Sequence, residues 1–213
     1  MKEEVLIPRA KELWSKLANF NDQFYLAGGT ALALQIGHRI SIDFDLFSET
    51  EIKKTLLKKV ETVFSKQEKR VLVNNRKELT LMIDGVKFTF LCYPFPKILP
   101  LEKMGSIQVL SVKEIFATKA YTIGRRGALK DYIDIYTGLK MGLVTLVEII
   151  ELANQKYGEL FNDRLFLEQL IFLADIEEVD ITMLDLFIPT KDEMIKYFSE
   201  LIKELDFVQK DGD

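Results

Sequence analysis

Two reactive residue types are almost missing from this chain of 213 residues, which contains one cysteine, Cys92, and one histidine, His38. A single cysteine cannot form an internal disulfide, so the composition favours a reducing cytoplasmic setting. A single histidine excludes metal centres and catalytic triads that depend on histidine. We expect His38 to order its turn and Cys92, which lies in an apolar segment without an evident basic partner, to be a core residue.

Long apolar runs and an excess of positive charge are also absent. No apolar stretch approaches the roughly 20 residues of a membrane-spanning helix. The first residues, MKEEVLIPRAKELW, place acids ahead of the apolar positions, which is unlike a secretion signal. The formal net charge is -4, which argues against a globally basic nucleic-acid coat but leaves room for a local basic patch. We expect a cytoplasmic protein with no membrane partner.

The residue patterns predict an α/β half followed by a helical half, with the change near Pro94, Pro96 and Pro100. We therefore predict an α+β fold with domains at residues 1–104 and 105–213. Asp84-Gly85 between two β-rich runs predicts a hairpin. Capping-box spacing predicts helix starts at Ser48, Ser111 and Thr190. The predicted strands are 24–27, 40–47, 70–74, 79–83, 86–93 and 107–110, and the predicted helices are 8–20, 30–36, 48–64, 111–123, 129–139, 145–155, 163–173 and 191–205.

The densest cluster of special residues runs from Phe24 to Phe47 and reads FYLAGGTALALQIGHRISIDFDLF. A short strand leads into Gly28-Gly29 and then into a helix that begins at Thr30. Glycine lets the backbone approach a phosphate closely, and the N-terminus of a helix directs unpaired amides at an anion. These elements predict a phosphate seat.

Asp43 and Asp45 lie two residues apart on the predicted strand 40–47, so their carboxylates share one face. Like charges so close repel each other, and a divalent cation relieves the repulsion. Oxygen ligands suit Mg²⁺, which keeps waters and substrate phosphates in its other positions. Each motif alone is usually a simple turn or a pair of surface acids. Their succession, with the acids set between apolar residues, indicates a functional site.

LAGGTALAL followed by GHRISIDFDLF resembles the signature of the nucleotidyltransferase superfamily, a Gly-Gly or Gly-Ser turn before Asp-x-Asp. The stretch is more closely similar to the AbiEii/AbiGii toxin family of bacterial abortive-infection systems. The resemblance covers roughly residues 24–139. Its second half consists of Ser111-Val112-Lys113-Glu114-Ile115, Lys119, Arg125-Arg126-Gly127 and Lys130-Asp131-Tyr132-Ile133-Asp134.

The resemblance implies a mixed β-sheet flanked by helices and followed by a helical C-terminal part. It also implies an enzyme that moves a nucleoside monophosphate from an NTP to an acceptor and releases pyrophosphate. The acceptor in some members is the 3′ end of tRNA, and the toxins are paired with an antitoxin protein. The expected partners are therefore Mg²⁺, an NTP, RNA and a cognate antitoxin.

The resemblance assigns roles to individual residues. Asp43 and Asp45 would bind the metal and act in catalysis, and Lys119 would contact phosphate. One of Asp131 and Asp134, with Asp131 preferred, would serve as a base or support Lys119. The expected triphosphate-binding residues are Gly28, Gly29, Thr30 and Arg39, and the candidate RNA-contacting or supporting residues are Arg125, Arg126, Lys130 and Asp134.

Several of these residues also have ordinary structural explanations. Lys119 could extend to solvent from a mostly apolar helix, and Asp131 and Asp134 could simply favour a helix dipole. Arg125, Arg126 and Lys130 could form a solvated loop.

One departure from the family pattern concerns a third carboxylate, which many nucleotidyltransferases carry on a neighbouring strand. The predicted strand 86–92 has no interior acid, and Thr89 stands where one is expected. Two other functions therefore stay open. One is a catalytically weakened relative that binds nucleotides or a partner, and the other is an enzyme that modifies a small molecule such as an aminoglycoside.

Overall fold

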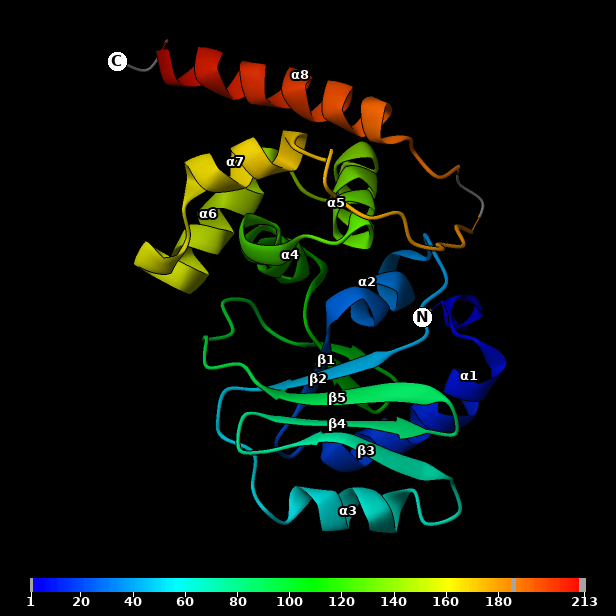
Figure 1. Cartoon of the computed structure of the whole chain (residues 1–213). Helices are drawn as coiled ribbons and strands as arrows, with labels where there is room; N and C mark the ends of the chain where they lie inside the picture. Colours follow the sequence, from blue (N-terminus) through cyan, green and yellow to red (C-terminus); the bar gives the residue numbers. More distant parts are fainter. Residues whose placement is uncertain (1, 185–186, 211–213) are drawn as a thin grey trace. The chain divides into compact units, whose positions relative to one another are not determined.

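The computed structural model describes residues 2–184 and 187–210 and divides into two compact units on either side of the Ser111–Val112 bond. The first unit contains a seven-stranded mixed sheet with short helices, and the second is built from helices (Figure 1). The predicted α+β class is confirmed. Among the described residues, no helix combines the length and the apolar character needed to span a bilayer.

The first unit alternates short helices and strands. Its helices are η1 (Glu3–Val5), α1 (Pro8–Trp14), η2 (Ser15–Phe20), α2 (Gly28–Ile36) and α3 (Leu56–Val63). Its strands are β1 (Tyr25–Ala27), β2 (Phe44–Ser48), β3 (Lys69–Asn74), β4 (Glu78–Ile83), β5 (Val86–Cys92), β6 (Glu102–Met104) and β7 (Ile107–Val109).

The strands of the sheet follow the order β3-β4-β5-β2-β1-β7-β6. β2 pairs in parallel with β5 and antiparallel with β1, while β1 pairs in parallel with β7. The predicted hairpin joins β4 to β5, and both of its turn residues have positive φ, 47° at Asp84 and 83° at Gly85. Such angles suit the tight turns of hairpins.

Alternation along β2 and β5 places Phe44 and Phe88 on one face of the sheet. Phe44 and Phe88 are fully buried with ring centroids 5.1 Å apart, and Phe64, directly after α3, packs on Phe88 at 5.2 Å. Because successive side chains of a strand point to opposite faces, Asp45 and Thr89 lie on the other face. Aromatic burial on one side thus sets which residues the sheet presents on the other.

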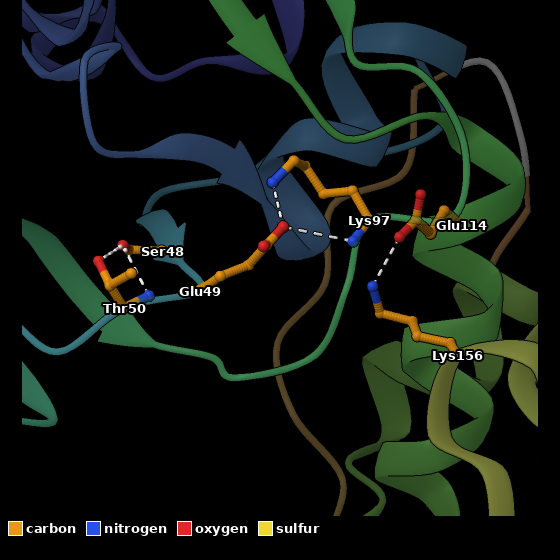
Figure 2. Close-up of polar contacts among 6 residues, drawn as sticks. All are labelled: Ser48, Glu49, Thr50, Lys97, Glu114 and Lys156. Carbon is orange, nitrogen blue, oxygen red and sulfur yellow. Dashed lines mark hydrogen bonds and ion pairs between the residues drawn. The ribbon is translucent and has the colours of Figure 1, made fainter.

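The predicted helix start at Ser48 is wrong, because α3 begins only at Leu56. Ser48 ends β2 opposite Cys92, and its Oγ accepts a hydrogen bond from the Thr50 amide at 3.3 Å (Figure 2). A serine that bonds two residues ahead stabilises a turn as readily as a helix cap. Nearby, the Glu49 carboxylate accepts from the Lys97 amide at 3.4 Å and pairs with the Lys97 ammonium group.

The predicted strand 40–47 is wrong in its first half, since β2 begins at Phe44. The preceding residues bond to the N-terminal segment instead. The Ser41 amide donates to the carbonyl of Val5 at 2.8 Å, and Ser41 forms an isolated bridge with Leu6. Asp43 therefore lies immediately before the strand that carries Asp45.

Other predicted boundaries also shift. α2 begins at Gly28, ahead of the predicted Thr30, and ends at Gly37, whose φ of 73° is typical of a helix stop. The first helix, predicted as 8–20, is α-helical only to Trp14 and continues as the 3₁₀ helix η2.

The second unit is organised around α4, which packs against α5, α6 and α7, while α8 packs against α5 and α7. The capping box predicted at Thr190 is confirmed, with Glu193 Oε2 accepting from the Thr190 amide at 2.8 Å. The helices of this unit are α4 (Val112–Arg126), α5 (Leu129–Lys140), α6 (Leu146–Tyr157), η3 (Gly158–Leu160), α7 (Asp163–Ile171) and α8 (Lys191–Lys210).

The break predicted at residues 124–127 is confined to Gly127 and Ala128, the two residues between α4 and α5. α4 continues through Gly124 to Arg126. The tolerance of a helix for one interior glycine, at a cost of about 1 kcal/mol, explains the difference.

Gly138 allows α5 to approach α4 closely. A Cβ atom at this position would lie 2.1 Å from Cζ of the fully buried Phe116. We expect Gly138→Ala to lower the free energy of unfolding by about 1–3 kcal/mol because the enclosed ring cannot move aside. The control Gly124→Ala, whose Cβ would meet nothing closer than Leu165 at 4.0 Å, should stabilise α4 by about 0.5–1 kcal/mol. Urea denaturation followed by circular dichroism measures both, and equal effects of the two changes would contradict this packing.

Candidate active site

Gly28 and Asp45 approach each other closely in the first unit. Gly28 has a φ of 69°, and a Cβ atom on it would lie 2.7 Å from Asp45 Oδ2. The first residue of helix α2 thus lies against the strand that carries the acid. The first four amides of a helix have no partner within the helix and favour an anion. The structure therefore places the predicted phosphate-binding turn beside one predicted metal ligand.

The side chain of Thr30 holds the main chain of Asp43, the second predicted metal ligand. Its buried hydroxyl group lies 2.6 Å from Ser41 Oγ and donates to the Asp43 carbonyl oxygen. This arrangement joins the first turn of α2 to the segment before β2. Ser41 was not predicted as a site residue, and only its place two residues before Asp43 could have indicated it.

Asp43 and Asp45 lie next to different residues of β5. Asp43 Oδ2 lies 3.2 Å from Lys87 Nζ, and both side chains are partly exposed. Asp45 is in register with Thr89. Lys87 was also missed from the sequence, because the pairing that brings it to Asp43 depends on the register of two strands. The register confirms that Thr89 lies directly beside Asp45, where a third carboxylate would complete an acid cluster.

Arg39 and His38 are almost fully buried, with 5% and 1% of their surfaces exposed. Arg39 Nη1 donates to the carbonyl oxygen of Ile40 at 3.2 Å. The structure thus shows Arg39 ordering the chain between α2 and β2, and its contact with phosphate stays a prediction.

Lys119 lies between two aspartates in the second unit. Its Nζ atom is 2.8 Å from Asp131 Oδ1 and 2.7 Å from Asp134 Oδ2. The lysine is 5% exposed and Asp134 is fully buried, so Lys119 does not extend to solvent. The second oxygen of Asp131 accepts from the amide of Ala128 at 3.2 Å, which caps α5. Both aspartates therefore pair with Lys119, and the role of one of them as a base or a support in the reaction stays a prediction.

A second buried ion pair joins α4 to α6. Lys156 Nζ lies 2.6 Å from Glu114 Oε1, and at most 1% of either side chain is exposed (Figure 2). Glu114 was predicted to cap α4, but the contact with Lys156 commits this oxygen to a tertiary interaction. The pair fastens α4, the helix that carries Lys119, to α6. Breaking it is costly, because removing either partner would leave a buried charge uncompensated.

The basic residues near the end of α4 differ in their surroundings. Arg125 is exposed, and its guanidinium carbon lies 3.6 Å from the ring centroid of Tyr121. Lys130 is exposed at the start of α5, and Arg126 ends α4. Their contacts with RNA stay predictions. A joint role for the groups around Asp45 and Lys119 stays a prediction as well.

The donor set of the first unit fits a magnesium ion. Two carboxylates with hard oxygen atoms, Asp43 and Asp45, belong to the segment next to the turn predicted to bind phosphate, and Mg²⁺ commonly takes one or two protein carboxylates together with substrate phosphates and water. Across residues 2–184 and 187–210, no group of three acidic, histidine or cysteine side chains forms a larger metal cage. The ion would therefore depend on the nucleotide for its remaining ligands.

A mixed sheet with a glycine turn opening a helix beside an acid-bearing strand defines a nucleotidyltransferase-like fold. Two solved structures share it. JHP933 from Helicobacter pylori aligns with a TM-score of 0.58 at 17% identity and covers 97% of each chain. MenT4, a nucleotidyltransferase toxin from Mycobacterium tuberculosis, aligns with a TM-score of 0.58 at 15% identity and covers 90% of this chain and 82% of its own.

Sequence comparison identifies the family. The family described as nucleotidyl transferase AbiEii toxin, type IV toxin–antitoxin system, matches residues 13–98 and 92–203. The protein aq_aa25 of Aquifex aeolicus is 29% identical over 185 residues, which are 86% of this chain and 88% of that protein. The chain belongs to the AbiEii family and is a nucleotidyltransferase of the toxin type.

The approach of Gly28 to Asp45 predicts a severe effect of a single methyl group. Gly28→Ala would place Cβ against the Asp45 carboxylate and strain a positive φ. We expect nucleotidyl transfer to fall about 100-fold, the scale of a displacement of roughly 1 Å at a reacting centre. The control is Gly105→Ala, which has a φ of 62° but open space around the new Cβ and should retain activity. A wild-type rate for Gly28→Ala would contradict this assignment.

The Lys119 cluster predicts a large effect on stability. Lys119→Met leaves Asp131 and Asp134 facing each other, with Asp134 fully buried. We expect a loss of about 3–5 kcal/mol in the free energy of unfolding, as for other broken buried pairs. Lys113→Met on the same helix removes an exposed pair with Glu148 and should change stability by less than about 1 kcal/mol. Chemical denaturation of both variants checks the difference, and similar midpoints would refute it.

Proposed function

We propose that this chain is a magnesium-dependent toxin that transfers a nucleoside monophosphate from an NTP to RNA, with the 3′ end of tRNA as the acceptor. In this reaction the acceptor hydroxyl oxygen bonds to the α-phosphorus and the bond between the α-phosphorus and the bridging oxygen breaks. Pyrophosphate leaves, and a base takes the proton. The observation that carries the proposal is the closeness of the phosphate-binding turn at Gly28 to the Asp45 carboxylate.

The first unit would hold the nucleotide. Gly28, Gly29 and the amide of Thr30 would bind the triphosphate at the start of α2, and Asp43 and Asp45 would hold Mg²⁺. The ion, when bound, neutralises phosphate charge and favours in-line displacement. Lys87, which pairs with Asp43, would contact a phosphate oxygen. Arg39 would keep the segment between the phosphate turn and the acids in place.

The second unit would supply positive charge and a base. Lys119 would contact a phosphate, oriented by the fully buried Asp134. Asp131 would receive the proton of the acceptor hydroxyl, because 14% of its side chain is exposed whereas that of Asp134 is not. Arg125, Arg126 and Lys130 would contact the RNA. The family also supports pairing with an antitoxin.

A catalytically weakened relative is the second candidate, favoured by Thr89 in register with Asp45. Without a third carboxylate, a second metal ion lacks a bridging ligand. Such a protein would bind the nucleotide without transferring it. The active enzyme is preferred because two carboxylates and the substrate phosphates suffice for one Mg²⁺.

Label transfer tests the proposed function. The protein is incubated with MgCl₂, each labelled NTP in turn, and either total bacterial RNA or an aminoglycoside. We expect label in tRNA, with a loss of about 10²–10³-fold in Asp45→Asn, the scale for removing one group that stabilises charge in a transition state. EDTA should abolish transfer and added Mg²⁺ restore it.

The matched control is Asp22→Asn, which removes an exposed acid paired with Lys59 and should leave transfer unchanged. NTP binding without transfer to any acceptor would favour the weakened relative. Label in the aminoglycoside but not in RNA would replace the RNA acceptor by a small molecule.

A further inference from the structure

A cavity of about 220 Å³ lies within the helical unit, between the end of α4, η3 and the start of α7. It is smaller than the roughly 300–1,000 Å³ of pockets for drug-sized ligands, so it suits a single ring system rather than a whole nucleotide. The residues that line it include Tyr121, Gly124, Arg125, Leu160, Asn162 and Leu165.

Three flat groups are stacked at this cavity. The rings of Tyr157 and Tyr121 are nearly parallel, with centroids 3.9 Å apart and an interplanar angle of 12°. The guanidinium group of Arg125 lies over Tyr121 at 3.6 Å. Two main-chain acceptors hold this group, the Tyr121 carbonyl at 3.2 Å from Nη1 and the Leu160 carbonyl at 2.7 Å from Nη2. Arg125 is thus an exposed, positively charged plane at the end of an aromatic stack.

Gly124 keeps the cavity open. The residue lies inside α4, where glycine costs about 1 kcal/mol relative to alanine, and its φ does not require glycine. A Cβ atom there would meet only Leu165 Cδ2, at 4.0 Å. A larger side chain at this position would project into the space between α4 and α7. Gly124, which is unfavourable within a helix, therefore lies beside an empty volume.

We propose that this cavity binds one unpaired nucleobase of the RNA acceptor, stacked on the guanidinium plane of Arg125. The inference rests on the proposed function, because it assigns a subsite to the RNA named there. Unpaired bases in RNA are commonly bound by stacking on aromatic rings or arginine planes, and the positive charge suits the adjacent phosphates. Asn162 also lines the cavity, and its Oδ1 accepts from the Leu165 amide at 2.9 Å, so its side-chain amide hydrogens would be the donors for a base acceptor atom.

Filling the cavity tests the proposal. The full chain is titrated with each of the four homopolymeric single-stranded RNAs and with a ribose-phosphate chain of the same length that lacks bases, using fluorescence anisotropy. We expect the wild type to bind at least one RNA about tenfold more tightly than the chain without bases. Gly124→Leu should abolish this difference, while Gly124→Ala should keep it. Circular dichroism and thermal unfolding confirm that each variant is folded.

Arg125 provides a second, independent measurement. Stacking needs the plane and not only the charge, so Arg125→Lys should lose the preference for bases as fully as Arg125→Ala does. Full affinity in Arg125→Lys would instead indicate a phosphate contact and overturn the proposal, as would an unchanged preference for bases in Gly124→Leu. If the wild type labels RNA but Gly124→Leu and the two Arg125 variants label it equally well, only the base-binding role of the cavity is refuted. If no RNA is bound or labelled at all, the proposed function fails as well.

Discussion

The close contact between the Gly28 backbone and the Asp45 carboxylate is the constraint on which the candidate site of the first unit depends. Gly28 adopts a positive φ directly beneath the Asp45 side chain, where even a methyl group would lie 2.7 Å from the carboxylate oxygen. The start of helix α2 and strand β2 can therefore approach each other closely. Thr30 and Ser41 secure the same junction from the buried side.

In the helical unit, buried ion pairs are the contacts that position the candidate residues. Lys119 is enclosed with Asp131 and Asp134, and Glu114 is enclosed with Lys156, so α4 carries two ion pairs that solvent hardly reaches. Such pairs add little net stability compared with apolar residues, yet each is costly to break. They fix the rotation of α4 about its own axis and the position of the Lys119 ammonium group. A flexible surface lysine would have to lose side-chain entropy each time it met a phosphate.

The residues of the candidate site in the first unit differ in how far they could be predicted. The glycine turn, Asp45 and the helix that follows were visible because their chemistry is concentrated within residues 24–47. Lys87 and Ser41 were not, because strand register and a bridge to the N-terminal segment bring them to Asp43 and Thr30. Ser48 shows the same limit. Its spacing to Glu51 fits a helix cap, but pairing with Cys92 in the sheet outweighs that local preference.

The sequence by itself determined the class of fold, the hairpin at Asp84-Gly85, the helix stop at Gly37 and the family. These features depend on local backbone preferences and on a short run of residues. Tertiary structure alone decided that Asp131 and Asp134 both hold Lys119, that Glu114 pairs with Lys156 and does not merely cap its helix, and that Thr89 lies beside Asp45. Each of these contacts joins separate elements, and the burial that makes their charges and registers matter arises only when those elements pack together.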